Sequence, residues 1–157
     1  MIDAKRRILL KGSLAAGAVG VAVGAGLLAP RAVLAAWPEA AFHASDVPSA
    51  LKALLGIDAG EASGDITIKA PDIAENGAVV PVTVESTLPG VKTIIIVAEG
   101  NQTPLIASFT LGAAAIASVS TRIKMGKTAN VQALVQTADK TFTASKEVKV
   151  TIGGCGG

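Results

Sequence analysis

The chain has 157 residues, of which 50% are apolar, 3% aromatic and 17% charged, with one cysteine, one histidine and a formal net charge of +2. This length is enough for one domain of ordinary size. A single cysteine excludes an internal disulfide framework, and one histidine with one cysteine is too few for a conventional His/Cys zinc site.

The first 36 residues have the order of an export signal. Four basic residues occur before residue 12, an uncharged run extends from Gly12 to Leu28, and small residues follow at 32–36. This is the order of n-region, h-region and cleavage site in a secretory signal. The stretch Lys-Arg-Arg-Ile-Leu-Leu-Lys near the start is similar to the twin-arginine export signal. We therefore predict a twin-arginine signal peptide over 1–36, cleaved after Ala35 or Ala36, and a periplasmic mature protein; a retained N-terminal anchor is the alternative.

Removal of this segment changes the charge balance. Residues 1–36 hold five of the 14 Lys/Arg residues and one of the 12 Asp/Glu residues, which leaves nine basic and eleven acidic groups in the mature chain. A mildly acidic domain without a basic cluster or aromatic stacking residues lacks what nucleic-acid binding requires, so that class is excluded. We also expect no stable membrane insertion after cleavage.

Residues 37–63 are predicted to form an N-terminal helical segment. The apolar pattern is helical to about Ile57, and Asp46 and Ser49 are candidate N-caps ahead of its second half. Gly56 is a natural helix stop. The connection that follows, to residue 64, is polar and contains glycine.

From residue 64 to 152 the apolar period changes to two, which predicts a β-domain. The run 93–97 is continuously β-branched, as in a strand that is buried on both faces. Turn signals separate seven strand candidates, which are 66–69, 80–85, 93–97, 105–111, 117–124, 128–137 and 141–152. This spacing favours a mainly β fold, an immunoglobulin-like antiparallel β-sandwich with a core of Val, Ile, Leu and Ala, although the family's Cys pair and tyrosine are missing.

The chain ends in Gly153-Gly154-Cys155-Gly156-Gly157, directly after the last predicted strand. Glycines offer no side chains to pack and lose much entropy on ordering, so we expect a flexible tail with few contacts to its own domain. A solvated thiol has a pKa of about 8.5, so a few per cent is thiolate near pH 7. Nothing adjacent in sequence would lower that value. The tail therefore suits a thiol that partner proteins activate.

Other interpretations of Cys155 differ in class. A buried structural cysteine is disfavoured because no apolar residue flanks it, and a prenylation signal is excluded because the cysteine is third from the end. A thiol oxidoreductase would need a lowered pKa or a helix N-terminus, and the tail offers neither. An exported β-sandwich interaction module whose cysteine forms an intermolecular disulfide remains the alternative.

The terminal pentapeptide resembles the end of the SoxY family, the sulfur-carrying subunits of the bacterial thiosulfate-oxidising (Sox) system. The twin-arginine signal is typical of that family too. Four internal segments look like its landmarks and occur in the same order: Ala74–Gly77, Val80–Val82, Pro104-Leu105 and Ser120–Met125.

The resemblance implies a periplasmic carrier that holds thiosulfate-derived intermediates covalently on Cys155, with Gly153, Gly154, Gly156 and Gly157 as its carrier arm. A haem protein would couple thiosulfate oxidatively to the cysteine sulfur, and a hydrolase would release sulfate and leave a persulfide. A dehydrogenase is a further expected component. The chain itself would be no enzyme and would carry no cofactor or metal. A second β-sandwich subunit, SoxZ, would form a heterodimer with it.

Other chemistry-bearing residues have simpler interpretations. His43 has no second ligand at metal-binding spacing. Glu61 and Asp65 fall in a connection without a calcium-loop pattern, so we expect them to be solvated. The segment Asn101–Thr103 matches a glycosylation acceptor, but it precedes a proline in a chain with a bacterial-type export signal, so we interpret it as a turn.

A small basic group is formed by Arg122, Lys124 and Lys127. A polar strand face is the favoured interpretation, and attraction of an anionic substrate or partner is the alternative. Glycine-rich phosphate loops, nucleophile elbows and HExxH patterns are absent from the sequence.

Overall fold

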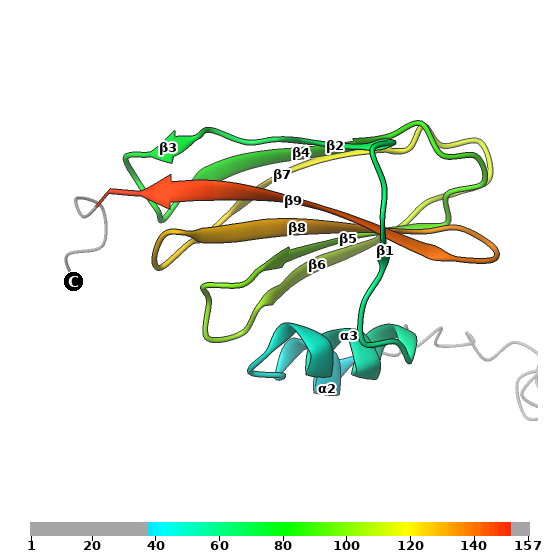
Figure 1. Ribbon diagram of the computed structural model, residues 1–157, viewed down its shortest axis with the longest axis horizontal. Coiled ribbons are helices and arrows are strands. Elements are labelled where there is room, and N and C mark those ends of the chain that lie inside the picture. The colour runs from blue at the N-terminus through cyan, green and yellow to red at the C-terminus, as the bar shows by residue number, and fades with distance from the viewer. Residues whose placement is uncertain (1–37, 152–157) are drawn as a thin grey trace, which may run out of the picture. The chain divides into compact units, whose positions relative to one another are not determined.

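Two β-sheets face each other in the computed structural model, which describes residues 38–151 (Figure 1). The larger sheet has the order β1-β9-β8-β5-β6 with β3 added beside β9, and the smaller sheet has the order β2-β4-β7. The strands are β1 (Glu61–Ala62), β2 (Ile66–Lys69), β3 (Ile73–Ala74), β4 (Val80–Ser86), β5 (Thr93–Ala98), β6 (Leu105–Thr110), β7 (Ser118–Ile123), β8 (Ala129–Gln136) and β9 (Thr141–Val150). The predicted signal peptide and the predicted carrier arm lie outside the described residues.

The distribution of strands between the sheets is that of an immunoglobulin-like sandwich. Of the seven strands longer than two residues, the first, second and fifth form the smaller sheet, and the others form the larger sheet. The predicted mainly β sandwich is therefore confirmed, and each predicted strand agrees with the structure to within two residues at either end. The seven longer strands pair antiparallel, as predicted. The two-residue strands β1 and β3 are additions to this arrangement and pair in parallel with β9.

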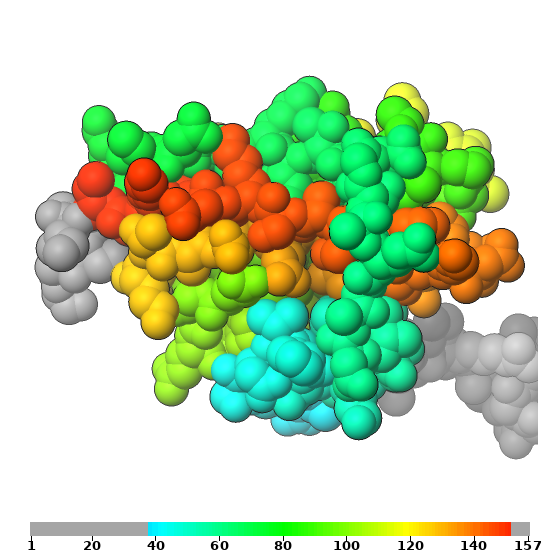
Figure 2. All heavy atoms as spheres, in the orientation of Figure 1, coloured from blue at the N-terminus to red at the C-terminus, as the bar shows by residue number. Residues whose placement is uncertain are grey.

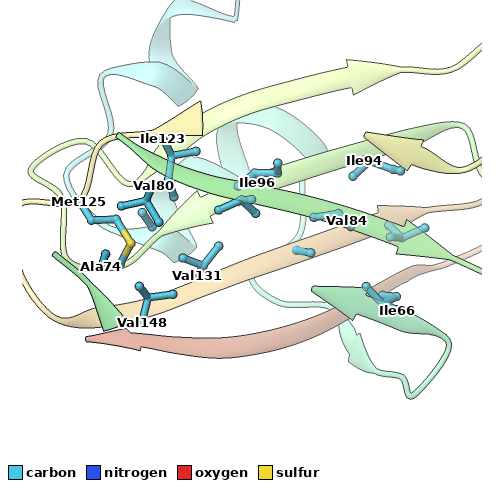
Figure 3. Close-up of a cluster of buried hydrophobic side chains, with 14 residues drawn as sticks. Ile66, Ala74, Val80, Val84, Ile94, Ile96, Ile123, Met125, Val131 and Val148 are labelled. Carbon is cyan, nitrogen blue, oxygen red and sulfur yellow. The ribbon is translucent and has the colours of Figure 1, made fainter. Parts of the chain in front are cut away.

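The space between the sheets is filled by side chains that alternate along each strand. Val80, Val82 and Val84 of β4 are fully buried, while the residues between them face outward. Figure 3 shows the side chains of β4 facing those of β5, β8 and β9 in the larger sheet, with Met125 at one end of this core. Each aliphatic side chain buried in this way contributes about 1.5–3 kcal/mol to folding. The predicted aliphatic core is present, with Met125 as an addition.

Strand β5 is buried on both faces, as its β-branched run predicts. All residues from Ile94 to Ala98 are buried. Ile94 and Ile96 face the core between the sheets, whereas Ile95 packs on the other side in a second cluster that includes Leu51 from the helices. The helices therefore cover the outer face of the larger sheet.

The predicted helical segment consists of two helices, α2 (Glu39–Phe42) and α3 (Val47–Leu55). The break between them has a local cause. Asp46 takes an extended conformation at φ −140° and ψ 159° and caps α3, because its Oδ1 accepts a hydrogen bond of 2.8 Å from the Ser49 N–H. Asp46 is thus the N-cap, and Ser49 is its donor rather than a second cap. Gly56 ends α3 in the left-handed region at φ 73°, as predicted.

The cap gives a pH-dependent contribution to stability. The hydrogen bond from the Ser49 backbone N–H holds the pKa of Asp46 below its ordinary value of 3.8. A carboxyl group whose folded-state pKa is depressed stabilises the fold above its unfolded-state pKa, and that stabilisation is lost as the pH falls through the folded-state pKa. We expect Asp46→Ala to lower the urea midpoint at pH 7 and to differ less from the parent protein at pH 2. Asp139→Ala, in an exposed turn, removes one carboxylate without removing a helix cap and is the control for the loss of charge.

Candidate functional site

The end of the sandwich at which β9 finishes is the part of the described chain nearest in sequence to Cys155. Register places the end of β5 and the start of β8 at this same end. The start of β4 and the end of β7 lie there too, because Gly77 before β4 approaches both Met125 after β7 and Val150 of β9. Figure 2 shows the end of β9, in red, between the segment around β3 and the start of β8. Cys155 itself lies outside the described residues, four positions beyond Thr151. Four residues span at most about 13–14 Å, so the thiol is confined to the neighbourhood of this end.

The end of β9 is anchored on both sides. On one side the Lys149 N–H donates to the Asp72 carbonyl at 3.0 Å, and the Thr151 N–H donates to the Ala74 carbonyl at 3.1 Å. On the other side the Val150 N–H donates to Thr128 Oγ1 at 2.9 Å. The chain is therefore held by hydrogen bonds up to its last described residue, and the position from which the predicted arm starts is fixed.

Two of the sequence landmarks meet beside this anchor. Gly77 is buried, and its carbonyl accepts a hydrogen bond of 2.7 Å from the Met125 N–H. A Cβ on Gly77 would lie 2.4 Å from the Met125 carbonyl oxygen and 2.8 Å from Val150 Cγ1. Glycine at this position allows a close approach between the β3–β4 loop, the end of β7 and the end of β9. The landmark Ala74–Gly77 thus has a structural role next to the base of the predicted arm.

The connection between β5 and β6 is tied to the same region. Asn101 Nδ2 donates to the Lys124 carbonyl at 2.6 Å, and Asn101 Oδ1 accepts from the Gly126 N–H at 3.2 Å. The Pro104 carbonyl accepts from the Ala98 N–H at 2.8 Å, which closes the connection. Asn101 therefore lies in a connection, as expected, and its side chain fixes the loop after β7. We call the two hydrogen bonds of the Asn101 side chain the clamp around Asn101. No local sequence pattern indicates this clamp or the contact of Thr128 with Val150.

The predicted basic group is divided between a strand and a loop. Arg122 is an exposed residue of β7, while Lys124 and Lys127 are exposed in the loop that follows, because β7 ends at Ile123. An open pocket of about 580 Å³ is lined by Arg122, Lys124 and the clamp around Asn101. The three basic residues thus lie at the end of the sandwich where β9 finishes.

The other candidate residues are accounted for by local contacts. His43 is exposed, with its Nε2 3.9 Å from a Glu39 carboxylate oxygen. Glu61 lies in β1 and accepts a hydrogen bond of 3.1 Å from the Lys140 ammonium group. Asp65 accepts hydrogen bonds from the Ser63 hydroxyl in its own loop and from the Thr87 hydroxyl after β4. Within residues 38–151, no three His, Cys, Asp or Glu side chains gather as a candidate metal site. No helix in that part of the chain is long and apolar enough to cross a membrane.

The Thr128 contact gives a direct test of how firmly β9 is held. Thr128→Val removes the acceptor for the Val150 N–H, and a hydrogen bond of this kind is worth about 1 kcal/mol. We expect hydrogen exchange at the Val150 amide to accelerate roughly fivefold. Thr137→Val, which removes a hydroxyl from the turn at the opposite end, should leave that amide unchanged. Equal exchange rates in both variants would show that Thr128 does not anchor the strand.

These features define a class of protein: an immunoglobulin-like sandwich whose last strand is fixed to its end and leads into a glycine-rich, cysteine-bearing terminus. The family model described as "Sulfur oxidation protein SoxY" matches residues 51–155, which include Cys155. The chain belongs to the SoxY family.

Solved structures agree with this assignment. The sulfur carrier protein SoxY from Chlorobium limicola f thiosulfatophilum is 44% identical, with a TM-score of 0.62 over 73% of this chain and 99% of that one. A superoxide reductase (neelaredoxin) from Ignicoccus hospitalis has a TM-score of 0.50 at 17% identity, over 55% of this chain and 80% of that one, and shows similarity of fold alone. Among curated proteins, none matches the chain.

Proposed function

We propose that this chain is a periplasmic sulfur carrier that holds thiosulfate-derived intermediates covalently on Cys155 while partner enzymes of the Sox system act on them. The observation that carries the proposal is the position of the chain's one thiol, four residues beyond a strand end that is anchored up to Thr151. The arm residues Gly153, Gly154, Gly156 and Gly157 surround that thiol without side chains. Family membership supports the carrier role, since its relative from Chlorobium limicola is a sulfur carrier protein.

The proposed chemistry requires only a thiol from this chain. The Cys155 thiolate and the thiosulfate dianion form a new S–S bond and give two electrons to a haem-containing partner, which leaves an S-thiosulfonate on the cysteine. A partner hydrolase then adds water at the sulfonate sulfur and breaks its bond to the bridging sulfur. Sulfate and two protons leave, and a cysteine persulfide remains. A dehydrogenase component would oxidise that sulfur in turn, and this chain would supply no catalytic group.

The proposed partners follow from the same role. A SoxZ-like β-sandwich subunit would form a heterodimer with this chain, and the haem, hydrolase and dehydrogenase components would visit the arm in sequence. Delivery to the periplasm would use the twin-arginine segment over 1–36. Fractionation of the host cells, followed by N-terminal sequencing of the mature chain, tests the delivery: a periplasmic protein that begins at Ala36 or Trp37 is expected.

The carrier role is tested by intact-mass measurement in a reconstituted reaction. The reduced mature chain with its partner subunit is incubated with thiosulfate and the oxidised haem component, and its mass is measured before and after a reductant is added. We expect an added S₂O₃ group that the reductant removes, and its conversion to a single added sulfur atom when the hydrolase is present. A symmetrical disulfide dimer as the only product would favour the interaction-module alternative.

A further inference from the structure

The unpaired cations of the described chain are concentrated at one end. Nine lysines and arginines lie in residues 38–151; four of them form ion pairs with carboxylates and five do not. Four of those five, Arg122, Lys124, Lys127 and Lys149, lie around the end of β9. The fifth, Lys92, directly precedes β5 at the opposite end of the sandwich.

Acidic residues at this end cancel only part of that charge. Asp72 is compensated because its carboxylate lies 3.0 Å from the Lys146 ammonium group. Glu99 accepts hydrogen bonds from the side-chain amides of Asn130 and Gln132 on the outer face of the larger sheet. These neutral amides leave the charge of Glu99 in place, so Glu75, Glu99 and Glu147 are three carboxylates without an ion pair. Four unpaired cations against three such carboxylates leave this end with an excess of one positive charge.

Exposed apolar side chains are found at the same end. Of the three large hydrophobic residues that are strongly exposed in the described chain, two lie there: Ile73 in β3 is 57% exposed, and Val79 just before β4 is 51% exposed. The third, Ile116, lies in the β6–β7 connection at the opposite end. Aliphatic residues among charged ones are the composition of a protein-binding surface with a polar rim. We call Ile73, Val79, Arg122, Lys124, Lys127 and Lys149 together the arm-end surface.

The length of the arm determines what approaches this surface. An enzyme that takes the Cys155 thiol into its active site must bring that site within about 13–14 Å of Thr151. If the active site lies at the bottom of a cleft, part of the arm must lie inside that cleft, and only the remainder spans the gap between the two proteins. The enzyme's outer surface must therefore contact the arm-end surface. We infer that the arm-end surface is the docking site for the partner enzymes that process the thiol, and that it recognises an acidic rim around the cleft that admits the arm. This inference rests on the proposed carrier role of Cys155.

The arrangement fits a protein surface better than a small anion. The four cations are exposed and come from three places, namely β7, the loop after it and β9, so they do not converge on one buried point. Single exposed charges attract a small anion weakly in water. Spread over a surface, the same charges raise the rate at which an oppositely charged protein associates, and salt screens this effect.

The test uses two double variants with equal changes in net charge. Lys124→Glu/Lys127→Glu reverses charge on the arm-end surface, whereas Lys92→Glu/Lys140→Glu does so at the opposite end of the sandwich. Each is made in the full mature chain, assembled with its partner subunit, and loaded on Cys155 with a thiosulfonate as verified by intact mass. The kcat/KM of the sulfate-releasing hydrolase for each loaded carrier is then measured from low to high salt.

We expect the arm-end variant to lose roughly tenfold or more in kcat/KM at low salt through a higher KM, with kcat at saturation retained. The opposite-end variant should stay within about twofold of the parent, and salt near 0.5 M should remove most of the difference. Equal kcat/KM for the two variants would overturn the docking surface while leaving the carrier role intact. Loss of the difference with sulfate but not with chloride at equal ionic strength would assign the cations to a small anion and also overturn it. Failure of the parent to load on Cys155 would overturn both proposals.

Discussion

Cys155→Ser is expected to abolish thiosulfate-dependent turnover in a reconstituted Sox system while leaving the free energy of unfolding unchanged. A hydroxyl group cannot form the S–S bond on which every later step depends, so the loss should be complete rather than partial. The residue lies four positions beyond Thr151, where the hydrogen-bonded end of β9 finishes. Turnover is measured as thiosulfate-dependent electron transfer to an external acceptor, and stability by urea unfolding.

A relocated thiol is the matched control. Thr151→Cys in the Cys155→Ser background restores one exposed thiol but places it at the end of the sandwich. This thiol lacks the four residues of chain that would let it extend into a partner's active site. The backbone N–H of residue 151 still bonds to Ala74, so the fold should be kept. We expect no recovery of turnover. Activity in Cys155→Ser alone would exclude the carrier role, and unfolding of that variant would show that the tail is structural.

The second large effect is expected from Gly77→Ala. The added methyl group would lie 2.4 Å from the Met125 carbonyl oxygen, which is backbone and cannot turn aside, and 2.8 Å from Val150 Cγ1. Either the hydrogen bond between Met125 N–H and the Gly77 carbonyl or the end of β9 must shift. Overpacking of this kind typically costs about 1–3 kcal/mol, and we expect the upper part of that range in the free energy of unfolding measured in urea.

Gly126→Ala adds the same methyl group in the neighbouring loop, where an added Cβ meets nothing within 4 Å. Its free energy of unfolding should stay within about 0.5 kcal/mol of the parent value. The pair therefore separates the effect of close packing from the general effect of replacing glycine. Similar stabilities for the two variants would mean that the close approach at Gly77 is not required.

Much of the sandwich is predictable because its strands are long enough to show a period. The alternation of Val80, Val82 and Val84 identifies β4 and its buried face, and the β-branched run of β5 correctly predicts burial on both sides. Strands β1 and β3 have two residues each, so no period exists to detect them, and their parallel pairing with β9 depends on tertiary contacts. Asp46 is a recognisable N-cap candidate in the sequence, but the apolar pattern does not show that one helix ends before it and a second begins there.

The candidate site also has a part that the sequence indicates and a part that only the fold reveals. The sequence singles out Cys155 because it is the one cysteine of the chain and has two glycines on each side. That interpretation stays a prediction, since these residues lie outside the described ones. The anchor of β9 could not be predicted: Gly77, Met125 and Thr128 are brought to Val150 by strand pairing, and no local pattern marks the contact. Arg122, Lys124 and Lys127 were visible as a group, but only the fold shows that they lie beside the end of β9.

The mass of the Cys155-containing peptide from cells that grow on thiosulfate tests the central claim most directly. The cells are quenched with an alkylating reagent, the chain is purified and digested, and the peptide is measured before and after reduction. We predict a substantial fraction that carries additional sulfur on Cys155, protected from the reagent and released by reductant, and absent from cells grown without reduced sulfur compounds. A peptide found only as the alkylated free thiol or as a symmetrical disulfide would contradict the account.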